Sequence, residues 1–233
     1  MKGFFVTGTD TGVGKTVIAG GLIKVLSFMG LKTAGMKPVE SGCMREGDIL
    51  IPSDGTFLKQ MARMTEPITE LTPCCFENPL APFAASGIEK KNVQITGIKK
   101  AFYGLYKNYD AIIAEGVGGL LVPLKKNYFV LDLAIEMDLP LIVVAKPGLG
   151  SINHTMLTVN YALKEGIKIA GIVINYSAPP QNDLAEETNP LILKEICPAP
   201  LLGIFPYLKS CEHSLIERTA LKKLDQEILK KYL

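Results

Sequence analysis

The sequence has almost no excess of charge. Its 25 basic and 23 acidic residues give a formal net charge of +2. Proteins that bind nucleic acid or an acidic membrane through their overall field are usually strongly charged, so we expect neither partner. Long hydrophobic runs are also missing, since no stretch approaches the roughly 18 uninterrupted apolar residues of a membrane span. The N-terminus is strand-like and lacks a cleavable signal pattern, which predicts a cytoplasmic protein.

Residue types that build metal sites and covalent catalysts are scarce. The chain has two histidines and five cysteines. The odd number of cysteines and the absence of paired ligand spacings argue against a disulfide framework or a zinc site. No Ser-His-Asp or Cys-His arrangement can be assembled. No Gly-x-Gly-x-x-Gly motif is followed by a ribose-binding acid.

The chain does contain regular alternation of apolar strands and amphipathic helices. Its 233 residues, 48% of them hydrophobic, predict one large α/β domain over residues 1–233. We expect strands at residues 2–6, 31–36, 110–114, 139–145, 169–174 and 201–205. We expect helices at residues 15–29, 55–64, 93–108, 129–137, about 151–165, 190–196 and 213–231. We expect a long loop up to residue 54, irregular or edge structure over 67–82, and a surface loop over 176–190. The alternation predicts a doubly wound, mostly parallel sheet with helices on both faces.

The first turn of this alternation is rich in glycine. Gly8-Thr9-Asp10-Thr11-Gly12-Val13-Gly14-Lys15-Thr16 lies between an expected strand and an expected helix. In this context backbone N–H groups converge on an anion, and the helix presents its positive end to it. Lys15 is then expected to reach the β- and γ-phosphates, and Thr16 to ligate Mg²⁺. The spacing departs from the usual Gly-x₄-Gly-Lys-Ser/Thr, because Thr9 holds the place of the first glycine.

Other unusual residues also follow strands, and ligands of such sheets bind at the carboxyl ends of the strands. Lys37 there could neutralise charge on a transferring phosphoryl group. Glu115, with Asp54 from the polar loop, could ligate Mg²⁺. The helix start at 150–153 could bind a carboxylate or phosphate, and Asn175 a base edge. Each of these residues also has an ordinary structural interpretation. Lys37 could be a surface lysine, the two acids could be solvated, residues 150–153 could be a capped helix start, and Asn175 could be a turn-forming asparagine. Together they predict an enzyme that hydrolyses Mg²⁺-ATP or Mg²⁺-GTP or transfers its phosphoryl group, with the substrate open.

Five segments, taken together and in order, resemble the dethiobiotin synthetase family, a branch of the P-loop nucleotide-binding proteins. The segments are the phosphate loop Gly8–Thr16, Lys37-Pro38-Val39-Glu40-Ser41-Gly42, Glu115-Gly116-Val117-Gly118-Gly119, Gly148-Leu149-Gly150-Ser151-Ile152-Asn153-His154-Thr155, and the strand end at Asn175. The shifted glycine is the family's own form of the loop. The resemblance runs from residue 2 to about 208 and is weak after Lys209. The family often has an acid where Gly12 stands, so any role of that acid is absent here.

The resemblance implies a reaction and a set of site residues. In this family ATP-dependent cyclo-ligases carboxylate 7,8-diaminononanoate with CO₂ and close the ring of dethiobiotin, a step of biotin biosynthesis. By resemblance, Lys37 and Lys15 are catalytic, and Thr16, Asp54 and Glu115 hold Mg²⁺. The implied ATP-binding residues are Gly12, Val13, Gly14, Lys15, Thr16, Val17, Asp54, Glu115, Gly116, Val117, Gly118, Asn175 and Tyr176. The implied substrate-binding residues are Thr11, Lys37, Ser41, Gly150, Ser151, Ile152 and Asn153. The last four are expected to come from the second subunit of a homodimer.

Two other interpretations stay open at this level. Switch-type P-loop ATPases of the partitioning and cell-division class share the nucleotide core, but they usually carry an extra lysine where this chain has Asp10. Their chains often end in an amphipathic helix, as this one is expected to. A domain associated with an amidoligase or acetyltransferase is the second alternative, although such domains usually belong to longer chains.

Overall fold

A computed structural model describes residues 2–233 of the chain. Six parallel strands form a central sheet in the order β12-β11-β10-β1-β7-β2. Their bounds are β1 (Gly3–Gly8), β2 (Thr33–Met36), β7 (Ala111–Glu115), β10 (Leu141–Ala145), β11 (Ile169–Asn175) and β12 (Leu201–Phe205). From β1 the chain crosses to the edge strand β2, returns to β7 beside β1, and then adds β10, β11 and β12 on the other side. The predicted doubly wound parallel sheet is therefore confirmed, and the carboxyl end of β1 lies at its switch point.

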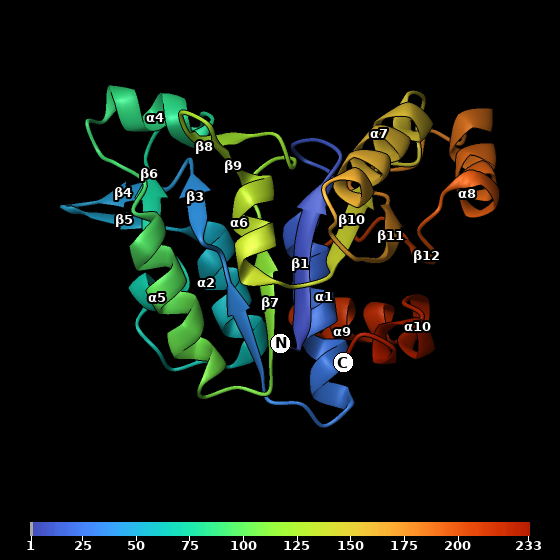
Figure 1. Ribbon diagram of the computed structural model, residues 1–233. Helices are drawn as coiled ribbons and strands as arrows, with labels where there is room; N and C mark the ends of the chain where they lie inside the picture. The colour runs from blue at the N-terminus through green and yellow to red at the C-terminus, as the bar shows by residue number, and fades with distance from the viewer. Residues whose placement is uncertain (1) are drawn as a thin grey trace.

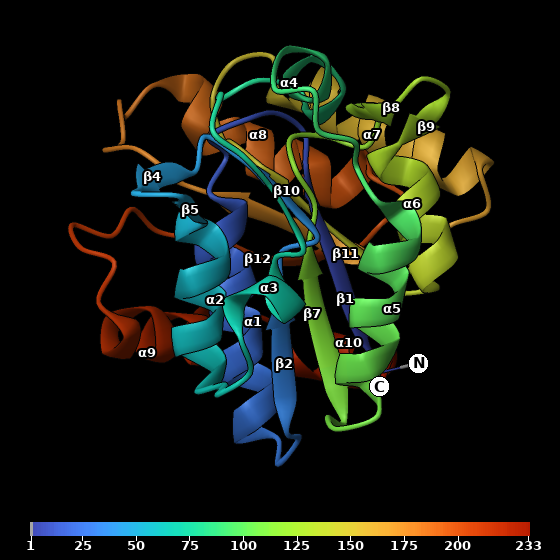
Figure 2. The ribbon, with the colours of Figure 1, turned by 90° about the vertical axis from the view of Figure 1, so that its left-hand side faces the viewer.

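Helices cover both faces of this sheet (Figures 1 and 2). One layer consists of α1 (Lys15–Phe28), α2 (Ser53–Ala62), α9 (His213–Lys223) and α10 (Gln226–Lys230). The other consists of α5 (Ile95–Tyr106), α6 (Val130–Met137), α7 (Ser151–Lys164) and α8 (Leu184–Ile196). No helix within residues 2–233 is both long and apolar enough to cross a membrane.

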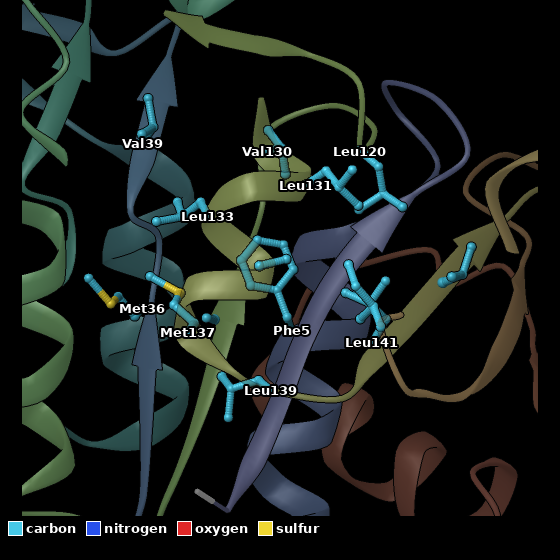
Figure 3. Packing of buried hydrophobic residues seen from close by; sticks show 14 of the residues in the cluster. Phe5, Met36, Val39, Leu120, Val130, Leu131, Leu133, Met137, Leu139 and Leu141 are labelled. Atoms are coloured by element: carbon cyan, nitrogen blue, oxygen red, sulfur yellow. The ribbon is translucent and has the colours of Figure 1, made fainter. Parts of the chain in front are cut away.

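The side-chain alternation of β1 explains why both layers pack on it. Phe4 and Val6 belong to the hydrophobic cluster under α1, whereas Phe5 belongs to the cluster on the opposite face. Figure 3 shows Phe5 among side chains that include Val130 and Met137 of α6. Burying each such side chain stabilises the fold by about 1.5–3 kcal/mol. A fully buried strand is thus fixed in the centre, and the loop after it is held at the carboxyl edge of the sheet.

Three small two-stranded sheets stand beside the main one. In the first, β3 (Val39–Ser41) pairs in parallel with β6 (Cys74–Phe76). In the second, β4 (Met44–Glu46) and β5 (Ile49–Ile51) form a hairpin that projects from the molecule (Figure 1). The third consists of β8 (Pro123–Lys125) and β9 (Tyr128–Phe129). Pro38 separates β2 from β3, because proline cannot donate the hydrogen bond that a central strand requires.

Several local expectations were wrong. The expected loop over 176–190 ends early, because Asp183 Oδ1 accepts a hydrogen bond from Glu186 N at 2.8 Å and starts α8 at Leu184. The expected closing helix over 213–231 is two helices, and Asp225 caps the second through Ile228 N at 3.0 Å. The region 67–82 contains a short helix, α3 (Ile68–Leu71), and β6, and α4 (Pro82–Ile88) begins at its end. All five cysteines are free.

Candidate active site

The loop between β1 and α1 is fixed by its glycines and by the end of β11. Gly12 and Gly14 have φ of 70° and 87°, in the left-handed region that favours glycine. Asn175 Nδ2 donates to the carbonyl oxygen of Val13 at 2.7 Å. A Cβ atom on Gly14 would collide with the same Asn175 amide. Asn175, predicted at the sheet edge, thus holds the glycine-rich loop in place.

Lys15 and Thr16, which follow the glycines, point to the middle of the carboxyl edge of the sheet. Lys15 Nζ donates to the carbonyl oxygen of Asp10 at 3.2 Å, and Thr16 Oγ1 donates to Glu115 Oε1 at 3.0 Å. Burial lowers the pKa of Lys15 from its ordinary value, and the nearby Glu115 opposes this only in part. An incoming polyanion would therefore stabilise the charge of this lysine.

Lys37 lies at the centre of the site and is almost fully buried. Its Nζ atom is 2.6 Å from Glu115 Oε1 and 2.8 Å from Asp54 Oδ2, and it also donates to the carbonyl oxygen of Gly116 at 3.3 Å. Burial alone would lower the pKa of Lys37, but the two carboxylates outweigh it and raise the pKa. Burial raises the pKa of Asp54, but Lys37, Thr16 and Lys15 together outweigh burial and lower the pKa. The lysine is thus held as a cation at a fixed point.

Asp54 reaches this position from a different element than its sequence context indicates. It is not in a loop, as expected, but in the first turn of α2. The β4–β5 hairpin occupies most of the residues that precede α2. The hairpin closes on itself, so α2 begins close to β3 and places Asp54 beside Lys37.

A cavity of 580 Å³ opens at this edge of the sheet. It brings together most of the predicted site residues: Thr11, Gly12, Gly14, Lys15, Thr16, Val17, Lys37, Ser41, Asp54, Glu115, Val117, Gly118, Asn175 and Tyr176. Val13 and Gly116 do not line the cavity but contribute the carbonyl groups described above.

The cavity has further walls that the sequence did not indicate. The loop before α4 contributes Pro79, Leu80 and Ala81, and the segment after β12 contributes Pro206, Tyr207, Leu208 and Cys211. The second group could have been found by the same reasoning that found Asn175, because it follows the carboxyl end of a strand. The first group follows a strand of a small side sheet and gave no such signal.

The start of α7 does not line this cavity. Ser151 instead lines a separate hollow of 650 Å³, which it shares with Gly12 and Val13. The turn before α7 is pinned by Asn189 of α8, whose amide donates to the carbonyl oxygens of Pro147 and Gly148 at 2.9 Å each. Within one chain, residues 150–153 are therefore outside the cavity that contains Lys37.

The oxygen atoms around Lys37 fit a magnesium ion. Glu115 Oε2 is buried and has no hydrogen-bond partner, and the Thr16 hydroxyl and the Asp54 carboxylate are close by. Mg²⁺ prefers such hard oxygen ligands and usually takes one or two carboxylates beside phosphate and water. Within residues 2–233 no group of three or more His, Cys, Asp or Glu side chains is placed to hold a metal. The donor set therefore suits an ion that phosphate oxygens also ligate.

Comparison with known proteins assigns the chain to a family. A family model described as an AAA domain matches residues 2–214. ATP-dependent dethiobiotin synthetase BioD of Thermodesulfovibrio yellowstonii is 47% identical over 234 residues, which cover 97% of this chain and 98% of that protein. The chain belongs to the dethiobiotin synthetase family. The family member from Bacillus licheniformis is 40% identical, with 98% of this chain and 96% of the relative covered.

Solved structures of proteins with other names also have a similar fold. The MinD cell division protein of Aquifex aeolicus superposes with a TM-score of 0.57 over 99% of this chain and 96% of that chain, at 14% identity. A ParA family ATPase from Chlorobium tepidum gives a TM-score of 0.54 over 99% and 96%, also at 14% identity. At such low identity the likeness shows the fold alone. Membership of the dethiobiotin synthetase family therefore disfavours the partitioning and cell-division alternative.

Proposed function

We propose that this protein is an ATP-dependent cyclo-ligase that makes dethiobiotin from 7,8-diaminononanoate and CO₂. One amine takes up CO₂ as a carbamate, and ATP phosphorylates the carbamate to a carbamic–phosphoric anhydride. The second amine attacks the carbonyl carbon, closes the cyclic urea and releases phosphate. The family membership supports the reaction, and the cation of Lys37 beside the glycine-rich loop is the observation that carries it. We place the reaction in the cytoplasm, where ATP and bicarbonate are available.

ATP is proposed to lie along the 580 Å³ cavity with its phosphates in the glycine-rich loop. The free N–H groups of the loop and the start of α1 suit the phosphate oxygens. The adenine is proposed to lie toward Asn175 and Tyr176 in the cavity that Val117 and Gly118 also line, with Gly116 next to them at the end of β7. Pro206 and Leu208 also line this cavity and offer apolar contacts for the base.

Thr16, Asp54 and Glu115 are proposed to hold Mg²⁺. The unpartnered Glu115 Oε2 supports this assignment, since a buried carboxylate oxygen without a partner is costly. When bound, the ion would neutralise charge on the β- and γ-phosphates. Lys37 Nζ now occupies the space between the two carboxylates. The carboxylates would exchange part of this lysine contact for the ion and leave the ammonium free to turn toward the γ-phosphoryl group.

Lys37 and Lys15 are proposed to offset the charge of the transferring phosphoryl group. Phosphoryl transfer needs little covalent help from the protein and depends mainly on positioning and electrostatic stabilisation. Lys15 is buried with a lowered pKa, so its charge is stabilised most when phosphate is present. No side chain is assigned as a general base, because the second amine can pass its proton to phosphate oxygens.

The diamine is proposed to lie between Thr11, Ser41 and Lys37, with its carboxylate on the α7 start of a second subunit. Thr11 lines both the main cavity and an adjoining groove of 470 Å³. Leu121, Leu157 and Tyr161 line that groove and are 54%, 63% and 36% exposed. An exposed apolar surface of this kind favours association with another protein surface. A homodimer that covers it would bring residues Gly150, Ser151, Ile152 and Asn153 of one chain to the substrate of the other.

The whole of residues 1–233 is proposed to act as one catalytic domain. A single six-stranded sheet with both helical layers packed on it supports this.

The decisive measurement is phosphate release from ATP with and without 7,8-diaminononanoate and bicarbonate. We expect release to require both, and dethiobiotin to form in equal amount by mass spectrometry. Release that is indifferent to the diamine would rule out the ligase and favour a switch-type ATPase. Lys15→Ala serves as the control, because it should abolish release under all conditions.

A further inference from the structure

The N-terminus of α2 is capped from outside its own segment. Its N-cap residue is Pro52, which has no side-chain hydrogen bond to offer. The carboxylate of Glu40 takes that role. Its Oε1 accepts from Asp54 N at 3.0 Å and from Ser53 Oγ at 3.1 Å, and its Oε2 accepts from Gly55 N at 2.9 Å. Three donors at the start of one helix therefore converge on a single acid from β3.

Glu40 is well placed to make these bonds strong. Its side chain is only 3% exposed, so its carboxylate is largely withdrawn from solvent. Hydrogen bonds to an ionised group are stronger than neutral ones. A helix N-terminus also favours a negative charge. Loss of the carboxylate would leave two backbone N–H groups of a functional helix without their partner.

The segment from Lys37 to Glu40 holds Asp54 through two separate contacts. Glu40 accepts the backbone N–H of Asp54, and Lys37 binds the Asp54 carboxylate at 2.8 Å. Pro38 lies between the two and fixes one backbone dihedral. Lys37 and Glu40, which hold Asp54, are therefore only three peptide units apart in the chain. Because of this short connection, a shift of Glu40 would also move the carboxylate of Asp54.

A second restraint keeps α2 from moving away. A Cβ atom on Gly55 would collide with Thr72 Oγ1, so the first turn of α2 lies directly against the residue after α3. Leu71, the last residue of α3, accepts a hydrogen bond from Lys37 N at 2.9 Å. The backbone of Lys37 and the first turn of α2 are thus held against the same short helix.

We propose that Glu40 is a positioning residue that holds Asp54 in place for magnesium and thereby sets how strongly Mg²⁺ binds with the nucleotide. The proposal rests on the assignment of Asp54 to Mg²⁺ made above, but not on the identity of the second substrate. Glu40 itself does not line the 580 Å³ cavity, so it would act through Asp54 and not by direct contact with the substrate or the ion. Replacing a residue that orients a metal ligand typically weakens metal binding 10- to 100-fold.

The test is the Mg²⁺ dependence of nucleotide binding, followed with a fluorescent, non-hydrolysable ATP analogue. For Glu40→Ala we expect the Mg²⁺ concentration at half-saturation to rise about tenfold. Binding of the analogue in EDTA should stay at the wild-type level. Glu40→Gln keeps the size of the side chain and one acceptor oxygen, so we expect a smaller rise; this variant decides the matter if Glu40→Ala does not fold.

A matched control separates positioning from simple loss of a helix cap. Asp225 caps α10 through Ile228 N at 3.0 Å, in a helix that does not contribute to the site. Asp225→Ala should lower the thermal midpoint without any change in the Mg²⁺ dependence. Ser53→Ala removes one donor but neither backbone bond, so its Mg²⁺ midpoint should also remain close to wild type.

The inference is overturned if Glu40→Ala and Glu40→Gln keep the wild-type Mg²⁺ midpoint, or if Asp225→Ala shifts it equally. It is also overturned if analogue binding by the wild-type protein does not depend on Mg²⁺. None of these measurements involves the diamine. A failure of the proposed ligase reaction would therefore be visible separately, as phosphate release that does not respond to the diamine.

Discussion

The ammonium of Lys37 lies 2.6 Å from the carboxylate of Glu115, and both side chains are almost completely buried, with 3% and 1% exposed. Such a pair gains little net stability, because the cost of desolvating two charges offsets much of their attraction. Removing one partner strongly destabilises the protein, because it leaves the other charge buried without a counter-ion. A pair of this kind at the edge of a parallel sheet, with a further carboxylate on the same lysine, is better explained by its use in catalysis.

Lys37→Ala should lower turnover about 10²–10³-fold, the effect of removing one donor that stabilises developing charge. Binding of ATP should weaken much less, because Lys15 and the glycine-rich loop remain. Steady-state kinetics and binding of a fluorescent ATP analogue measure the two effects. Comparable losses in both would remove Lys37 from the catalytic role. Lys59→Ala on the same helix as Asp54 is the control and should leave both unchanged.

Gly14→Ala should abolish nucleotide binding for a steric reason. The left-handed backbone at Gly14 costs a non-glycine residue roughly 1–2 kcal/mol, and the new Cβ would also displace Asn175 from its bond to Val13. Gly30→Ala is a close control, because φ there is 88° and no atom lies within 4 Å of the added Cβ. We expect both variants to lose stability by thermal unfolding because of the left-handed backbone, and Gly14→Ala to lose more because it also displaces Asn175. Only Gly14→Ala should lose binding of the ATP analogue; equal binding would show that Asn175 does not support the loop.

The hydrogen bond between Tyr109 and Glu66 predicts a pH-dependent contribution to stability. Tyr109 Oη donates to Glu66 Oε1 at 2.7 Å. Partial burial raises the pKa of Glu66, but the Tyr109 hydrogen bond, the backbone N–H groups of Thr65 and Glu66 and the charge of Lys32 together outweigh it, so the pKa lies below the ordinary value of 4.5. The ionised form is thus favoured by folding. The contribution is fully present above the unfolded pKa and is lost as the pH falls through the folded one.

Tyr109→Phe should therefore lower the free energy of unfolding at pH 7 by about 0.5–1.5 kcal/mol. The difference from the wild type should shrink as the pH falls below 4.5, because Glu66 becomes protonated in both proteins. Urea unfolding at pH 7 and pH 3.5 measures it. Tyr103→Phe, at an exposed tyrosine of the same helical region, should show no such change; a pH-independent deficit for Tyr109→Phe would contradict the assigned cause.

The sequence predicted which residues reach the active edge but not how they combine there. Lys37, Glu115 and Asn175 could be placed because each follows an apolar run, and parallel strands end at one edge. That Lys37 bonds Glu115 depends on the pairing of β2 with β7, whose residues are far apart in the sequence. Glu40 gave no signal as a cap, because its partners in α2 approach only after the β4–β5 hairpin has folded back.

Mixing two inactive variants tests whether the start of α7 serves the site of a partner subunit. Lys37→Ala removes a residue from the cavity, and Asn153→Asp places a negative charge where the substrate carboxylate is proposed to bind, so each homodimer should be inactive. In a heterodimer one of the two sites would combine the intact Lys37 of one chain with the intact α7 of the other. Random re-association of equal amounts, after mild denaturation and refolding, should restore about one quarter of the wild-type activity. If α7 serves its own chain, no site in the mixture is intact and no activity returns. Leu157→Arg, which puts a charge on the exposed apolar face of α7, should prevent both dimer formation in sedimentation experiments and this recovery, because the shared site cannot form in a monomer.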